Sequence, residues 1–115
     1  MSGVSYARSE RVQELSGAVF GQRHRLALMA AIAQSEDGVV NPTDLVETLQ
    51  LRAQSSLQGP LNSLLSAGLV TRISGIGDRV YYRREASAAW EFALELLARA
   101  LREDSQHDQL AQPDR

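Results

Sequence analysis

The apolar residues in the first third of the chain predict two helices that differ in how fully they are buried. In the first helix, residues 9–20, Ser9 is a suitable N-cap, and the apolar side chains Val12, Leu15 and Val19 fall on one side. In the second helix, residues 22–34, apolar side chains lie almost all round, which is typical of a central buried helix. We therefore expect the second helix to lie in the middle of the fold.

A short apolar pair, Val39 and Val40, predicts a stub of strand before a third helix with a well-marked start. Asn41 offers a side-chain oxygen to the unpaired amides of the first turn, and Pro42 loses nothing by lacking an N–H there. The third helix is expected over residues 43–49, followed by a three-residue turn and a fourth helix from about Ala53. Two helices joined by a tight turn are the expected result.

The fourth helix, residues 53–66, has one apolar side and one small, uncharged side. On a helical wheel the apolar side consists of Ala53, Leu57, Leu61, Leu64 and Leu65. The opposite side is rich in hydrogen-bonding groups and consists of Ser55, Gly59, Asn62 and Ser66, flanked by Ser56, Gln58 and Ser63. Pro60 lies inside this helix and predicts a kink, because it removes one backbone hydrogen bond.

After the fourth helix, which Gly68 is well placed to end, the apolar period changes from helical spacing to two. Residues 70–73 and 79–83 are predicted to form a hairpin around a glycine-rich connection, residues 74–78. Arg72 and Arg79 flank this connection, so the sequence predicts a protruding loop with positive charge on both sides.

The last predicted helix, residues 87–101, has an apolar arc too broad for one contact. It carries Trp90, Leu94, Leu97 and Leu101, and also Ala89, Phe92, Ala93, Leu96 and Ala100. Such a helix normally packs against both its own subunit and a partner. The expected organisation is a flexible N-terminus (1–8), one domain (9–102) and a disordered acidic tail (103–115).

Charge is distributed unevenly along the 115 residues, whose formal net charge is −2. No positive field of the whole protein favours nucleic acid, yet residues 48–84 carry five Arg against one acid, Asp78. Every cation is Arg, whose planar group suits phosphate and guanine recognition, although a GC-rich genome gives the same bias. The middle of the chain is therefore the candidate basic surface.

Several classes of function are not indicated. The chain has no Cys and only two His, His24 and His107, so we expect no disulfide, no metal site and no metal-controlled regulation. No catalytic constellation or phosphate loop is marked, and we expect neither an enzyme nor a cofactor. No apolar run or signal peptide is evident, so the expected location is cytoplasmic, without a membrane partner.

The order of these elements resembles the winged helix-turn-helix transcription factors, especially the ArsR/MarR-type dimeric repressors. The resemblance covers residues 23–101 and rests on the stretch 44–57, on Leu61 and Leu64, on Ala67-Gly68-Leu69-Val70 and on Tyr81-Tyr82-Arg83. Gln50 departs from the pattern, because such turns often have Gly there. Either the turn takes no left-handed residue, or Gln50 accepts that strain.

The resemblance implies a mainly α fold with a small β-hairpin and a role in binding double-stranded DNA. The fourth helix would enter the major groove, and the base-reading residues would be Gln54, Ser55, Gln58 and Asn62. The wing would meet the backbone or the minor groove. Phosphate contacts would come from Arg52, Ser56, Arg72, Arg79, Arg83 and Arg84. The alternative interpretation is that these arginines form a solvated charged edge.

The resemblance also implies a homodimer. The candidate interface joins the first and last predicted helices through Val12, Leu15, Val19, Trp90, Leu94, Leu97 and Leu101. The alternative is that these two helices satisfy each other within one subunit. For the function as a whole, the alternative is a winged-helix module that binds a protein instead of DNA. The operator and any small-molecule effector are not indicated by the sequence.

Overall fold

The computed structural model describes residues 5–75 and 77–111, and within the last helix it describes side chains only as far as Ser105. The elements, in chain order, are a 3₁₀ turn η1 (Tyr6–Arg8), α1 (Glu10–Phe20), α2 (Arg25–Gln34), β1 (Val39–Val40), α3 (Pro42–Leu49), α4 (Ser55–Ser66), β2 (Val70–Ser74), β3 (Val80–Arg84) and α5 (Ala88–Ala111). The predicted fold class is confirmed: the chain is mainly helical, with a small antiparallel sheet, and has a winged helix-turn-helix fold.

Helix α2 forms the centre of the molecule and packs against α1, α3, α4 and α5. Its side chains from Leu26 to Ala30 are all buried, as its apolar surround predicted. The helix begins at Arg25, later than predicted, because Gly21 takes a left-handed conformation (φ 75°) and ends α1. The buried Ser16 hydroxyl donates to the Gln22 carbonyl and accepts from the Leu26 amide, which fixes the corner between the two helices.

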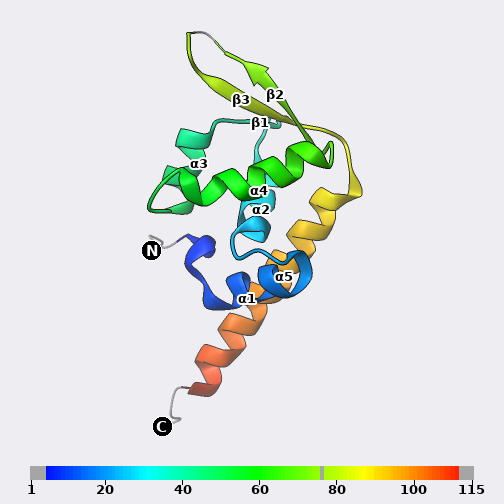
Figure 1. Cartoon of the computed structure of the whole chain (residues 1–115). Helices are drawn as coiled ribbons and strands as arrows, with labels where there is room; N and C mark the ends of the chain where they lie inside the picture. The colour runs from blue at the N-terminus through cyan, green and yellow to red at the C-terminus, as the bar shows by residue number, and fades with distance from the viewer. Residues whose placement is uncertain (1–4, 76, 112–115) are drawn as a thin grey trace.

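The sheet has the strand order β1-β3-β2, with both pairings antiparallel. Val40 pairs with Tyr82 and Ile73 with Tyr81, so the two-residue strand β1 extends the hairpin by one short strand at its base. Figure 1 shows the hairpin β2–β3 projecting beyond the helices, as its glycine-rich connection predicted. We refer to this hairpin, residues 70–84, as the wing.

In the turn between α3 and α4, Gln50 accepts the left-handed conformation that was one of the two expected alternatives. Gln50 has φ 58° and ψ 42°, so this residue adopts the left-handed conformation that glycine takes more easily. The strain costs about 1–2 kcal/mol. The side-chain Oε1 of Gln50 accepts a hydrogen bond from the backbone N–H of Ser5 at 2.9 Å. Gln50 therefore also connects the N-terminal segment to the turn.

Helix α4 begins at Ser55, two residues later than predicted, because residues 53–54 form a turn before it. The helix runs through Pro60 as one element, and Pro60 is buried against the core. The predicted kink at this residue stays a prediction. Leu57, Leu61 and Leu64 are buried on the same side, as the helical wheel predicted.

The ends of the chain are more structured than the sequence suggested. Helix α5 continues to Ala111, well beyond the predicted end at Leu101, and so includes much of the expected acidic tail. Contacts with α1 explain the extension: Arg11 pairs with Glu103 at 2.5 Å, and the Ser9 hydroxyl donates to the Asp104 carboxylate. At the other end, Tyr6–Arg8 form the turn η1, with Ser5 as its N-cap and Ala7 buried. Residues 1–4 and 112–115 lie outside the described residues.

Part of the predicted dimer interface belongs to the core of the subunit itself. Val12, Trp90 and Leu97 are buried among the residues of α2 and α5, and Leu15 and Leu94 are partly buried against the same core. Helices α1 and α5 therefore bury much of their apolar surface within one subunit. Val19 and Leu101 remain 43% and 39% exposed.

Candidate nucleic-acid interface

The outward side of α4 carries the four residues that the sequence singled out for base recognition. Gln54, Ser55, Gln58 and Asn62 are all exposed. Ser55 and Asn62 lie on the side of α4 opposite its buried leucines, Gln58 lies on the flank, and Gln54 is the N-cap residue that precedes the helix. In Figure 1, α4 crosses the front of the molecule below the wing. The fold therefore brings these side chains together on one accessible surface.

A groove of about 340 Å³ runs between α4 and the wing. Gln54, Gln58 and Asn62 line it from α4, and Arg72 lines it from β2. Its remaining lining is contributed by Pro42, Leu57, Leu61, Val80 and Tyr82. Amide side chains that can pair with base edges and a guanidinium that can pair with phosphate thus share one concave surface.

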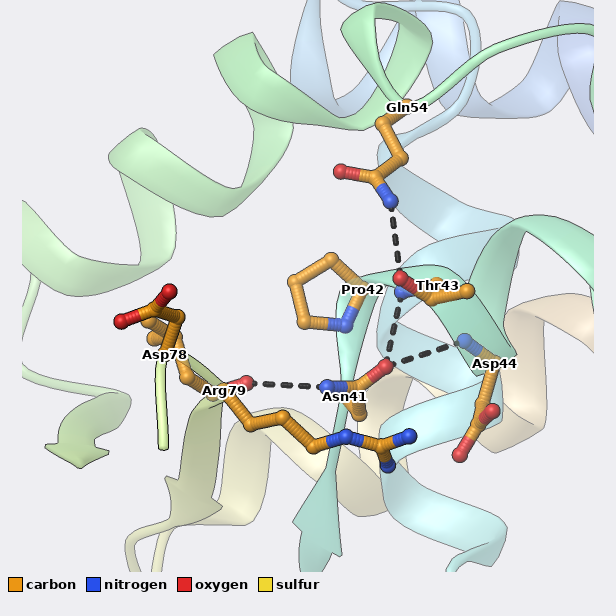
Figure 2. A pocket seen from close by; sticks show the side chains of 8 residues that line it. Asn41, Pro42, Thr43, Asp44, Gln54, Asp78 and Arg79 are labelled. Carbon is orange, nitrogen blue, oxygen red and sulfur yellow. Dashed lines mark hydrogen bonds between the residues drawn. The ribbon is translucent and has the colours of Figure 1, made fainter. Parts of the chain in front are cut away.

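A second hollow, of about 360 Å³, lies beside the groove at the start of α3, as Figure 2 shows. Asn41 caps α3 by accepting from the Thr43 and Asp44 amides at 2.9 and 3.2 Å, as predicted. Its side-chain nitrogen also donates to the Val80 carbonyl of the wing at 3.1 Å. Asn41 is only 8% exposed, so this one side chain fixes the wing relative to the helix-turn-helix.

The start of α4 is tied to the same point. The Gln54 amide donates to the Thr43 hydroxyl at 2.8 Å (Figure 2). Sequence reasoning missed Thr43 and the second bond of Asn41 as positioning contacts. The cap signal marked the position of Asn41, but Val80 is 39 residues away, and periodicity carries no information on that contact.

Arg79, at the base of the wing loop, lies back along the wing. The pKa of Arg79 is raised, mainly by a hydrogen bond to Tyr81 and by the charge attraction between these two side chains. Asp44 attracts the guanidinium as well. Figure 2 shows the guanidinium reaching past Asn41 towards Asp44. Arg79 is nevertheless exposed, so it remains accessible from outside.

The predicted phosphate-binding set divides into two groups. Arg52, Arg72 and Arg79 are exposed around α4 and the wing, and Ser56 is half-buried on the flank of α4. Arg83 is exposed but pairs with Glu85 at 3.2 Å. This pair and the Thr71 hydroxyl, which is the larger cause, lower the pKa of Glu85.

Arg84 differs from the other arginines of the predicted set, because it is half-buried and its guanidinium is bonded to the body of the protein. Its guanidinium donates from one nitrogen to the carbonyls of Ile32, Ala33 and Ser35 at 2.7, 2.9 and 3.1 Å. These carbonyls end α2, where unpaired acceptors and the negative end of the helix dipole favour a cation. Arg84 therefore closes the central helix.

Neither a metal-binding cluster nor a membrane-spanning helix is present among the described residues. Among the described residues, no group of three His, Asp or Glu side chains is arranged to hold a metal ion. In the same part of the chain, every helix is too short or too polar to cross a membrane.

Comparison with known proteins supports the fold. The chain is similar to the crystal structure of the transcriptional regulator BldR from Sulfolobus solfataricus, with a TM-score of 0.64 and 16% sequence identity. The match covers 92% of this chain and 74% of the BldR chain. No protein-family model and no curated protein sequence matches the chain. The fold is thus shared with a structure whose sequence identity to this chain is low.

Proposed function

We propose that this protein is a DNA-binding transcriptional regulator that reads the major groove of double-stranded DNA with α4 and contacts the backbone or minor groove with the wing. The observation that carries the proposal is the groove in which Gln54, Gln58 and Asn62 of α4 face outward beside Arg72 of the wing. Gln and Asn side chains can pair with adenine through two hydrogen bonds. A neighbouring arginine supplies a phosphate contact that orients the helix.

The local charge agrees with this role better than the net charge does. Three exposed arginines, Arg52, Arg72 and Arg79, surround α4 and the wing, although Asp44 and Asp78 lie close to Arg79. A surface of this kind binds DNA with modest electrostatic support, so its affinity must fall as salt displaces the phosphate contacts. BldR, the similar structure, is described as a transcriptional regulator.

The test is a fluorescence anisotropy titration against fragments of the source genome, including the DNA beside the protein's own gene, at two salt concentrations. We expect affinity to fall with salt and Arg79→Ala to weaken binding, since one phosphate contact is lost. Arg99→Ala is the matched control, because Arg99 is an equally exposed arginine of α5 that pairs with Glu95, away from α4. If no duplex binds, the surface serves a protein partner instead and the proposal is wrong.

We also propose that the protein acts as a homodimer, through α1 and α5. Among the described side chains of these helices, the large hydrophobic residues with the greatest exposure are Val19, Phe92 and Leu101, at 43%, 44% and 39%. Phe92 already packs edge-on against Phe20, with ring centroids 6.1 Å apart. A dimer would cover this apolar surface and present two α4 helices to half-sites about one helical turn apart.

Light scattering tests the assembly. We expect twice the monomer mass for the natural chain and a monomer for the double variant Val19→Glu, Leu101→Glu, because charged groups at a buried interface leave unpaired charge. Gln58→Glu, an exposed substitution on α4, is the control and should remain dimeric. A natural chain that is monomeric at micromolar concentration would contradict the interface.

Repression is the sense of regulation that we propose, since a dimer bound across a promoter blocks access to it. Transcription in vitro from a template that carries the bound fragment should fall as protein is added. A rise in transcript would instead indicate an activator.

A further inference from the structure

A third pocket, of about 350 Å³, lies on the other side of α3 from the groove. Its walls come from five separate elements: η1, the end of α2, β1, α3 and β3. The lining is Tyr6, Ala31, Gln34, Ser35, Val39, Val40, Asn41, Asp44, Leu45, Thr48 and Tyr81. A volume of this size falls within the range of small-molecule sites, and a cavity less than half as large accepts benzene.

The chemistry of the lining limits what can bind. Ala31, Val39 and Leu45 provide apolar walls, while Gln34 and Thr48 provide uncharged hydrogen-bonding groups. The Tyr6 hydroxyl lies 3.4 Å from the Gln34 side-chain oxygen, and burial raises the pKa of Tyr6 to about 12. Tyr6 is therefore a neutral phenol that can donate or accept a hydrogen bond.

Among the described residues that line this pocket, Asp44 alone carries a formal charge. An anionic ligand would meet this carboxylate, whereas a protonated amine would pair with it in competition with the Arg79 guanidinium, which reaches towards Asp44 from outside the lining. We propose that the pocket binds a small organic amine, with its ammonium group against Asp44 and its apolar body against Ala31, Val39 and Leu45.

Arg79 connects this pocket to the surface that carries the proposed function. The guanidinium of Arg79 interacts with Tyr81, which lines the pocket, and reaches towards Asp44 (Figure 2). An ammonium group at Asp44 repels the guanidinium and offsets its attraction to Asp44. Occupancy of the pocket therefore changes where Arg79 lies on the wing, a consequence for DNA binding that rests on the proposed function.

The experiment measures ligand binding without DNA, so its failure leaves the DNA-binding proposal intact. Three probes of nearly equal size are titrated by calorimetry at pH 7: 2-phenylethylamine, which is protonated, 2-phenylethanol, which is neutral, and phenylacetate, which is anionic. We expect the amine to bind at least tenfold more tightly than the acid, with the alcohol between them.

Three variants locate the site. Asp44→Asn should remove the preference for the amine, and Asp44 is exposed, so the substitution is compatible with folding. Arg79→Ala should tighten amine binding several-fold, because a competing cation beside Asp44 is removed. Ala31→Leu should weaken all three probes by filling the cavity. The inference is overturned if no probe saturates by 10-fold molar excess at about 1 mM protein, if the acid binds as tightly as the amine, or if Asp44→Asn leaves the preference unchanged.

Discussion

The two ends of the wing use the same residue type in opposite ways. At the base of the wing, Arg84 reaches inward and donates to three carbonyls at the end of α2. Towards the tip, Arg72 and Arg79 are exposed and border the hollows beside α4. The difference follows from position, because the base of the wing meets the central helix whereas the outer part extends beyond the helices (Figure 1).

This comparison shows that a locally basic sequence is not a uniform basic surface. Neighbouring residues of an extended strand point to opposite faces of a sheet. Arg83 and Arg84 therefore have different surroundings: Arg83 pairs with the half-buried Glu85, whereas Arg84 is bonded to the end of α2. The arginines of the wing must accordingly affect stability and DNA binding by different amounts, and the variants below separate the two properties.

The largest effect is expected from Arg84→Ala. The substitution leaves the last carbonyls of the central helix without their charged donor, and we expect a loss of about 2–3 kcal/mol in the free energy of unfolding. Urea denaturation measures the loss. Arg84→Lys, which keeps the charge but not the planar group, should fall between the natural chain and Arg84→Ala; an unchanged unfolding midpoint for Arg84→Ala would contradict the inward role.

Next in size is the effect of Asn62→Ala on sequence discrimination. Asn62 lines the groove from α4, and loss of a good pairing with one base should reduce discrimination at that base pair by about 1–3 kcal/mol. Competition with single-base variants of the bound fragment measures this reduction. Ser66→Ala, at the end of the same outward face, is the control. Equal changes for every base variant would show that Asn62 only positions α4.

Arg72→Ala should weaken DNA binding without selecting among sequences. If Arg72 contacts one phosphate, its removal lowers the slope of log affinity against log salt by about 1. The unfolding midpoint should stay at its natural value, because Arg72 is exposed. A large loss of stability with an unchanged salt slope would show that Arg72, like Arg84, stabilises the fold. The proposed contrast between the two ends of the wing would then be wrong.

The smallest effect is expected from Arg83→Ala. Arg83 is half exposed and its pair with Glu85 is on the surface, where such pairs contribute little. Thermal melting of the variant should match that of the natural chain within error, and its DNA affinity should change less than that of Arg72→Ala. A marked loss of either property would show that the two adjacent arginines act as one unit.

Patterns along the chain were sufficient to predict the order of the elements and the buried faces of the helices. The spacing of Leu57, Leu61 and Leu64 was enough to orient α4, because periodicity depends only on neighbours along the chain. For the same reason Asn41 was found as a helix cap, and the hairpin was found from its alternating residues and glycines. These features depend only on residues that are close together in the sequence, so they can be predicted without knowledge of the tertiary structure.

Only the tertiary structure decided which charged and apolar groups are available to a partner. The inward turn of Arg84, the link from Asn41 to the wing and the burial of Val12 all depend on segments far apart in the sequence. The extension of α5 depends likewise on Arg11 and Ser9 reaching it from α1. Contacts across such separations leave no periodic trace, since they arise from the three-dimensional packing of the elements around α2.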